Sequence, residues 1–415
     1  MKYGLIGYPL GHSVSPQLHR MLGCTDYSLC PLAPEVLGPF LEKEPFSGLN
    51  VTIPYKQAVL PYCQRLSPLA RAIGSVNTLV READGTLSGY NTDYAGLSRA
   101  LVQLSLSLGQ AKVVILGTGG AARTAHALAQ AEGAAGVTLV SRSGPVDYQT
   151  VYGLEDTDLL INATPVGMYP RNEEQPVDLA RFPRLKGVVD LIYNPLRSRL
   201  LLQGEALGLV CGNGLLMLAQ QAKAAEELFQ KRPLPEESAS RAARQLERDM
   251  TNIVLIGMPG CGKTTLGKAL AQQMGRPFMD TDALVEEKTG RTIPQIFAEA
   301  GEIAFRKLEA EAVAKAAAQT GLVLACGGGA VLSPENRLAL RQNGRCYFLE
   351  RDTNELAREG RPLSANPEAV ARLAREREPI YRRLADQTVR NDGRSLAAAD
   401  AIKEDFYAHF GNQRA

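Results

Sequence analysis

The chain has 415 residues, of which 45% are hydrophobic and 22% charged, a composition typical of globular proteins with about two or three domains. The formal net charge of +2 argues against a nucleic-acid-binding surface as the main purpose of the molecule. No apolar run approaches the roughly 20 residues that span a bilayer, and the glycine-broken start is too short for a signal peptide, so we expect no membrane partner.

The first part of the chain, to about residue 96, alternates short apolar strands with turns and helical stretches. Two candidate catalytic residues follow such segments: Lys56 comes after residues 50–55, and Asp93 after residues 91–92. A lysine paired with a carboxylate can hold and relay a proton at the oxygen of a carbonyl that is being reduced. Any lysine and aspartate are by default solvated surface residues, so the spacing alone leaves both interpretations open.

A strand predicted at 113–116 opens a second α/β segment and is followed by a Gly-x-Gly-x-x-Ala turn. The glycines allow close approach of backbone N–H groups to a pyrophosphate, which the helix N-terminus attracts. After the next predicted strand, at 137–140, an arginine between two serines stands where NAD enzymes carry an acid, so we predict NADP. The expected cofactor contacts are Gly117, Gly119, Gly120, Ala121, Ala122, Ser141, Arg142 and Ser143.

Several motifs of this half occur in the order seen in shikimate dehydrogenases, which the chain resembles over about residues 1–231. They are YPLGHSVSP (8–16), NVTIPYK (50–56), IGSVNT (73–78), NTD (91–93), INAT (161–164), DLIYNP (190–195) and GLLMLAQQA (214–222). The resemblance implies a fold of two α/β domains, a substrate-binding catalytic domain at 1–98 and 213–232 and a Rossmann NADP-binding domain at 99–212. It also implies a catalytic Lys56 with Asp93 beside it.

The same resemblance implies the substrate ligands. Hydroxyl and carboxylate groups of the substrate would meet Ser13, Ser15, Thr52, Asn77, Asp93 and Gln221, with Tyr193 and Gly214 near the substrate and the nicotinamide. One departure is that Pro145 and Val146 stand where family members often carry a second basic residue, so NADP preference is expected to be weaker.

Residues 233–250 shift in composition and are predicted to be a linker, part of it helical. Residues 251–415 then resemble an independent α/β domain. A strand at 253–256 leads into GMPGCGKT (257–264), the pattern of a P-loop that binds ATP. Gly257, Gly260, Gly262 and Thr265 would contact phosphates, Lys263 would reach the β and γ phosphates, and Thr264 with Asp280 would hold Mg²⁺.

The acceptor side of this P-loop domain resembles shikimate kinase from about 251 to 411. The matching motifs are GEIAFRKLE (301–309), CGGGAV (326–331), RPL (361–363) and REPIY (377–381). The resemblance implies that shikimate is bound by Asp282, Arg306, Gly328, Gly329 and Arg377. Asp282 would accept the proton of the attacking hydroxyl, Arg361 would be the lid arginine, and Arg358 would lie by the adenine. The stretch between these last two arginines is shorter than expected, which puts lid closure in question.

Together the two resemblances imply a bifunctional enzyme that reduces 3-dehydroshikimate with NADPH and phosphorylates the resulting shikimate with ATP and Mg²⁺. The seven dispersed cysteines fit reduced thiols, and we expect a cytoplasmic location. Two alternatives stay open: a dehydrogenase that also oxidises quinate, and a catalytically inactive regulator. The linker interpretation predicts that residues 1–232 and 250–415 work as separate enzymes.

Overall fold

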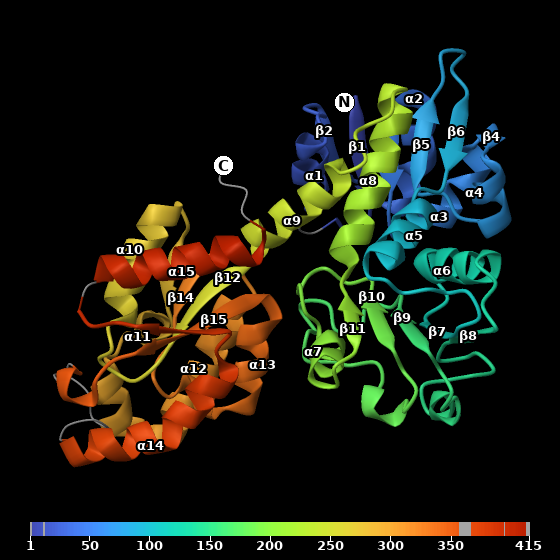
Figure 1. The fold of residues 1–415 in the computed structure, drawn as a ribbon. Coiled ribbons are helices and arrows are strands. Elements are labelled where there is room, and N and C mark those ends of the chain that lie inside the picture. Colours follow the sequence, from blue (N-terminus) through green and yellow to red (C-terminus); the bar gives the residue numbers. More distant parts are fainter. Residues whose placement is uncertain (1, 11–12, 357–366, 394, 412–415) are drawn as a thin grey trace. The chain divides into compact units, whose positions relative to one another are not determined.

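The computed structural model describes residues 2–10, 13–356, 367–393 and 395–411. The chain divides into two compact α/β units, the first made of Met1–Asn194 and Ser198–Leu246 and the second of Pro195–Arg197 and Glu247–Ala415. Three sheets with their helices make up these units (Figure 1).

The first sheet of the first unit has six strands in the order β2-β1-β3-β5-β6-β4. Its inner strand β1 pairs in parallel with β2 and β3 and is buried along its whole length, as expected for a strand of a parallel sheet segment. The elements are β1 (Tyr3–Gly7), α1 (Ser15–Met21), β2 (Tyr27–Pro31), η1 (Pro34–Val36), α2 (Leu37–Lys43), β3 (Gly48–Val51), α3 (Tyr55–Ala58), η2 (Leu60–Tyr62), β4 (Arg65–Leu66), α4 (Pro68–Ile73), β5 (Thr78–Arg81), β6 (Leu87–Tyr90) and α5 (Asp93–Gln103).

The second sheet of the first unit is wholly parallel, with the order β11-β10-β9-β7-β8. Side chains of β7 alternate between two cores: Val113 and Ile115 pack on one face, and Val114 and Leu116 on the other. The elements are β7 (Lys112–Leu116), α6 (Gly120–Ala131), β8 (Gly136–Val140), η3 (Thr150–Gly153), β9 (Leu159–Asn162), η4 (Leu179–Arg181), β10 (Gly187–Asp190), α7 (Arg199–Ala206) and β11 (Val210–Gly212).

The chain then returns to the first sheet through helix α8 (Gly214–Gln230), which packs on α1 and α5 (Figure 1). This crossing places residues from the start and end of the first unit side by side. The predicted strands at 113–116 and 137–140 are confirmed.

Helix α9 (Ser238–Met250) occupies most of the predicted linker. Ala239, Ala242, Ala243 and Leu246 recur at helical spacing and are buried, and the three alanines share a cluster with Leu18 and Ala222. Residues up to Leu246 therefore belong with the first unit by their packing. The part of the helix up to Leu246 is a structural part of the first unit, so a cut after residue 232 would expose apolar surface.

The sheet of the second unit is parallel, with the order β13-β14-β12-β15-β16. The elements are β12 (Asn252–Ile256), α10 (Lys263–Met274), β13 (Phe278–Asp280), α11 (Thr281–Thr289), α12 (Ile293–Ala317), β14 (Val323–Ala325), η5 (Ala330–Leu332), α13 (Pro334–Asn343), β15 (Gly344–Glu350), η6 (Thr353–Glu355), α14 (Pro367–Leu384), β16 (Gln387–Arg390) and α15 (Ser395–His409). Helix α12 is interrupted at Gly301, which has a φ of 78°, a backbone angle that glycine adopts without steric strain. The predicted strand at 253–256 is confirmed.

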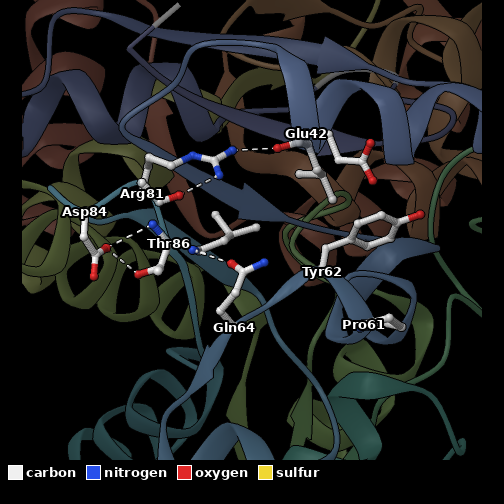
Figure 2. A pocket seen from close by; sticks show the side chains of 10 residues that line it. Glu42, Pro61, Tyr62, Gln64, Arg81, Asp84 and Thr86 are labelled. Atoms are coloured by element: carbon white, nitrogen blue, oxygen red, sulfur yellow. Dashed lines mark hydrogen bonds between the residues drawn. The ribbon is translucent and has the colours of Figure 1, made fainter.

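A surface hollow of about 490 Å³ lies beside the β5–β6 hairpin (Figure 2). Within it Arg81 donates hydrogen bonds to the carbonyls of Leu41, at 2.6 Å, and Gly85, at 3.3 Å, while the backbone N–H of Leu87 donates to the Gln64 side chain. Its polar groups therefore tie the hairpin to α2. None of the sequence-predicted site residues lines this hollow.

Candidate active sites

Lys56 and Asp93 form an ion pair, with 2.6 Å between Nζ and Oδ2, although they lie 37 positions apart in the sequence. Lys56 is on the short helix α3 that follows β3, and Asp93 is the first residue of α5. A carboxylate at a helix N-terminus is stabilised by the unpaired N–H groups and the helix dipole. The lysine side chain is 19% exposed and the aspartate 8%, so the lysine can meet a ligand while its carboxylate stays buried.

The other oxygen of Asp93 accepts a hydrogen bond from Asn77, at 2.9 Å. The same Asn77 amide group donates to Gln221 of α8, at 3.3 Å. Four sequence-predicted residues, from α3, the loop before β5, α5 and α8, thus meet in one hydrogen-bonded group. Such a group fixes the carboxylate and leaves polar atoms for the hydroxyls of a ligand.

Ser13 and Ser15 share a hydrogen bond of 3.1 Å between their hydroxyl oxygens. The hydroxyl of Tyr193 interacts with Ser13 and with the backbone of Val14, and burial raises the pKa of this tyrosine despite those hydrogen bonds. Thr52 lies directly after β3, where its N–H donates to Ile6. The two serines and the tyrosine can therefore present hydroxyl donors to one carboxylate.

The turn between β7 and α6 has the geometry of a dinucleotide loop. Gly117 has a φ of 107°, and a Cβ there would lie 3.0 Å from the carbonyl oxygen of Ala163. A Cβ at Gly119 would meet open space, which leaves room for a ligand over the helix N-terminus. A Cβ at Gly120 would lie 3.0 Å from Ser75 Oγ and 3.2 Å from Lys56 Cδ. The loop fits a pyrophosphate and packs directly against the lysine.

Ala121 and Ala122 continue this loop into α6, where Ala122 is fully buried. Ser141, Arg142 and Ser143 follow β8, and Arg142 is exposed. Burial raises the pKa of Tyr148, and the positive charge of the nearby Arg142 partly opposes this increase. An exposed guanidinium between two hydroxyls fits a 2′-phosphate.

Gly214 begins α8 and packs on the carbonyl of Leu191 so closely that a Cβ would overlap it. This close approach holds the start of α8 against the loop that carries Tyr193. The same loop is supported by Asp190, whose carboxylate accepts hydrogen bonds from Asn162 and Ser198. Burial raises the pKa of Asp190 to about 7 against these hydrogen bonds.

Two polar contacts near the dinucleotide loop could not be predicted from the sequence. With its amide oxygen turned toward α6, Gln57 accepts hydrogen bonds from the Arg123 guanidinium at 3.2 Å. Asn91 donates to Thr124 of α6, at 3.4 Å, and to the carbonyl of Ser75. Both contacts join the neighbours of Lys56 and Asp93 to the helix that begins at the glycine turn.

In the second unit, the turn between β12 and α10 holds Gly257, Gly260 and Gly262 at φ values of 148°, 84° and 96°. Lys263 is buried and donates to the carbonyls of Gly257 and Met258, at 2.9 Å each. Glycine at such angles turns successive N–H groups into an anion-binding concavity. The loop therefore fits nucleotide phosphates, which can replace the two carbonyls as partners of the ammonium group.

Thr264, the second residue of α10, donates to Asp280 Oδ2 at 2.7 Å. A hydroxyl and a carboxylate at this distance suit a Mg²⁺ ion bound together with phosphate oxygens. Thr265 follows on the exposed side of α10.

Asp282 lies at the start of α11, and its N–H donates to Asp280 Oδ1. Burial raises the pKa of Asp282 to about 6, with the negative charges of Asp280, Glu309 and Glu286 adding to it and Lys263 opposing it. A Cβ at Gly327 would overlap the Asp282 carboxylate. The glycine therefore allows the backbone to approach the carboxylate closely.

Arg306 donates to Glu309 at 2.7 Å and to Glu302 at 2.9 Å, and a Cβ at Gly329 would overlap its guanidinium. Arg377 of α14 is 4% exposed, and its Nε has no hydrogen-bond partner among the described residues. A buried cation with an unused donor is suited to an anionic ligand.

Two residues quoted only as motif members also have contacts in this site. Glu309 is 3% exposed and fixes Arg306, and Tyr381, one turn after Arg377, donates to the Gly328 carbonyl. Arg358 and Arg361 lie outside the described residues.

The first unit thus has the architecture of a dinucleotide-dependent oxidoreductase, and the second that of a P-loop kinase for a small anionic alcohol. Family models agree: the shikimate dehydrogenase substrate-binding domain matches residues 5–79, and shikimate kinase matches residues 259–406.

Similar proteins extend both matches. The chain is 39% identical over 257 residues to the shikimate dehydrogenase (NADP(+)) of Oleidesulfovibrio alaskensis, which covers 56% of this chain and 91% of that protein. It is 46% identical over 155 residues to the shikimate kinase of Symbiobacterium thermophilum, a match that covers 35% of this chain and 89% of that protein. A chorismate mutase/shikimate 5-dehydrogenase fusion protein from Clostridium acetobutylicum has a TM-score of 0.56 at 35% identity, covering 59% and 96%. The chain belongs to the shikimate dehydrogenase family in its first part and to the shikimate kinase family in its second, and is a bifunctional enzyme.

Across the described part of the chain, no helix combines the length and the apolar character needed to cross a membrane.

Proposed function

We propose that the first unit reduces 3-dehydroshikimate to shikimate with NADPH and that the second unit phosphorylates shikimate to shikimate 3-phosphate with ATP. The observation that carries the first reaction is the Lys56–Asp93 pair packed against Gly120 of the dinucleotide loop. The observation that carries the second is that Asp282 and Arg306 lie against two glycines of the triple glycine that follows β14, while α14 supplies the buried Arg377.

In the reduction, Lys56 donates a proton from Nζ to the ketone oxygen of the substrate. NADPH, when bound, would supply the hydride to the carbonyl carbon, so that C=O would become CH–OH. Asp93, fixed by Asn77, orients the lysine through their ion pair, and the lysine regains its proton from solvent. Ser13, Ser15, Thr52 and Gln221 bind the carboxylate and ring hydroxyls, with Tyr193 and Gly214 beside the ring.

The cofactor contacts follow from the loop geometry. The N–H groups at 117–122 hold the pyrophosphate, and Ser141, Arg142 and Ser143 hold the 2′-phosphate. The similarity to the shikimate dehydrogenase (NADP(+)) of Oleidesulfovibrio alaskensis supports this assignment.

In the phosphorylation, Asp282 accepts the proton of the substrate hydroxyl as its oxygen attacks phosphorus. Bound MgATP supplies the phosphoryl group, and ADP leaves. A pKa of about 6 leaves this carboxylate ionised at neutral pH and a stronger base than an ordinary aspartate. Lys263 would exchange its carbonyl partners for phosphate oxygens, and Thr264 and Asp280 would hold Mg²⁺. Arg306 and Arg377 would bind the carboxylate of shikimate.

We also propose the limits of the parts: a dehydrogenase at 1–246, which includes α9 up to Leu246, and a kinase from 247 onward. A cytoplasmic location is part of this proposal, since the cosubstrates are nucleotides.

The substrate range tests the proposal. Oxidation of NADPH by the purified chain is measured with 3-dehydroshikimate and with 3-dehydroquinate, and release of ADP is measured with shikimate and with quinate. We expect turnover with the first substrate of each pair. Equal turnover of the quinate-type substrates would favour the broader dehydrogenase, and absence of both activities would favour a regulator.

A further inference from the structure

Thr78 lies directly behind the proposed substrate ligand Asn77 and is fully buried. It begins β5, where its register partners are Asn50 of β3 and Tyr90 of β6. Its hydroxyl has polar neighbours on three sides: Asn50 Nδ2 at 3.2 Å, Asn77 Oδ1 at 3.2 Å and Thr92 Oγ1 at 3.1 Å.

The hydrogen bonds around this hydroxyl have a direction. The amide N–H of Asn50 can only donate, so the Thr78 oxygen accepts there and its single proton is directed to Asn77 or Thr92. The amide oxygen of Asn50 in turn accepts from the Tyr27 hydroxyl, at 2.8 Å. A relay therefore runs from Tyr27 through Asn50 and Thr78 to Asn77.

The orientation of the Asn77 amide decides what its other end does. The amide oxygen accepts from the backbone N–H of Thr92, at 2.7 Å, and the Thr78 and Thr92 hydroxyls, each 3.2 Å away, are the further donors that can reach it. With the oxygen held on that side, Nδ2 points to the Asp93 carboxylate, at 2.9 Å. A reversed amide would place an oxygen against that carboxylate, where two acceptors repel.

We propose that Thr78 is a positioning residue for the reduction, because its hydroxyl holds Asn77 in the orientation that fixes Asp93 and, through it, Lys56. The inference rests on the proposed roles of Asn77, Asp93 and Lys56. It assigns a role in the reaction to a side chain that is fully buried.

The test compares Thr78→Val with Thr78→Ser in the full chain. Valine keeps the volume and removes the hydroxyl, whereas serine restores it. For Thr78→Val we expect kcat for 3-dehydroshikimate to fall about tenfold, as for loss of one buried hydrogen-bond partner. We also expect a higher KM for this substrate and a larger isotope effect with NADPH deuterated at the transferred position. The KM for NADPH and the kinase activity of the same chain should not change, and Thr78→Ser should recover most of the loss.

A purely structural role would give a different result. A smaller folded fraction lowers apparent kcat but leaves KM and the isotope effect at their wild-type values, and that outcome overturns the proposal. Thr157→Val is the matched control, since this buried threonine donates to the Leu154 carbonyl and should leave all these values unchanged. If Thr78→Val does not fold, Tyr27→Phe at the far end of the relay is the deciding variant. We expect it to change kcat, KM and the isotope effect in the same direction but by less. No change in these values would contradict the relay.

Asn77→Ala separates the two levels of the argument. If it reduces 3-dehydroshikimate as well as the wild type does, the proposed substrate site is wrong. If it loses activity while Thr78→Val keeps wild-type kcat and KM, only the role of Thr78 is wrong.

Discussion

Replacing Asp282 by asparagine should remove phosphoryl transfer and at the same time stabilise the kinase unit. The carboxylate is partly buried and faces other carboxylates, and these effects raise its pKa from 3.8 to about 6. A group kept at a functional site against such a penalty is a common trade of stability for activity.

The direction of this effect on stability follows from the number of protons bound by the folded and unfolded states. Because the folded-state pKa is the higher one, the unfolded chain loses the Asp282 proton first as pH rises. The contribution of the protonated Asp282 to the stability of the folded state is therefore fully present below about pH 4. It is lost as pH rises from about 4 to about 6. A shift of about two pKa units corresponds to at most about 3 kcal/mol at neutral pH, an upper figure because the side chain keeps some contact with solvent.

Hydrogen exchange of peptides that cover β12 and β15 measures opening of this unit in the full chain. We expect Asp282→Asn to exchange more slowly than the wild type at about pH 7 and equally at about pH 4, where both side chains are neutral. Asp400→Asn, at an exposed position of α15, is the matched control and should change neither value. Phosphorylation of shikimate should be lost while MgATP still binds.

Faster exchange of Asp282→Asn at neutral pH would refute the electrostatic reasoning, because it would mean that the ionised carboxylate stabilises the fold. Retained phosphoryl transfer would refute the proposed role as a base.

Four further predictions concern the dehydrogenase and the division of the chain. Lys56→Ala should lower the kcat for 3-dehydroshikimate by about 10²-fold or more while NADPH still binds, as measured by steady-state kinetics and cofactor titration. Arg142→Asp should shift the ratio of kcat/KM from NADPH toward NADH, and an unchanged ratio would remove Arg142 from the 2′-phosphate site. Gly120→Ala should impair reduction more than Gly119→Ala, because only the first methyl group meets Ser75 and Lys56; equal kinetics for the two variants would count against this contact. A fragment ending at 246 should be more stable to heat than one ending at 232, because α9 buries Ala239, Ala242 and Ala243 against α1 and α8; equal melting temperatures would mean that this packing contributes nothing.

The elements that could be predicted are those with a strong local pattern. The apolar run at 113–116, the glycine turn after it and the P-loop after 253–256 each combine a strand signal with a phosphate loop, and the structure has them at these places. Helix α9 also had a local signal, since Ala239, Ala242, Ala243 and Leu246 follow helical spacing. Its alanines and arginines resemble a linker in composition, and only the partner surface on α1 and α8 distinguishes the two.

The site contacts could not be predicted from the sequence alone, because they join residues far apart in the chain. Lys56 and Asp93 are 37 positions apart, and Asn77 and Gln221 are 144 apart. Spacing gave no reason to pair them, and only the resemblance to known families did. The hydroxyl of Thr78 shows the limit most clearly, since a threonine at the start of a strand is an ordinary feature until its three polar neighbours are known.

The most direct test of the account is product analysis by mass spectrometry after incubation with 3-dehydroshikimate, NADPH and MgATP. The wild type should form shikimate 3-phosphate, Lys263→Ala should stop at shikimate, and Lys56→Ala should form product only from added shikimate. A mixture of the two variants should restore shikimate 3-phosphate, because each supplies the reaction that the other lacks. Loss of both activities in either folded variant, or failure of the mixture, would contradict the conclusion that this chain joins two complete and separate active sites.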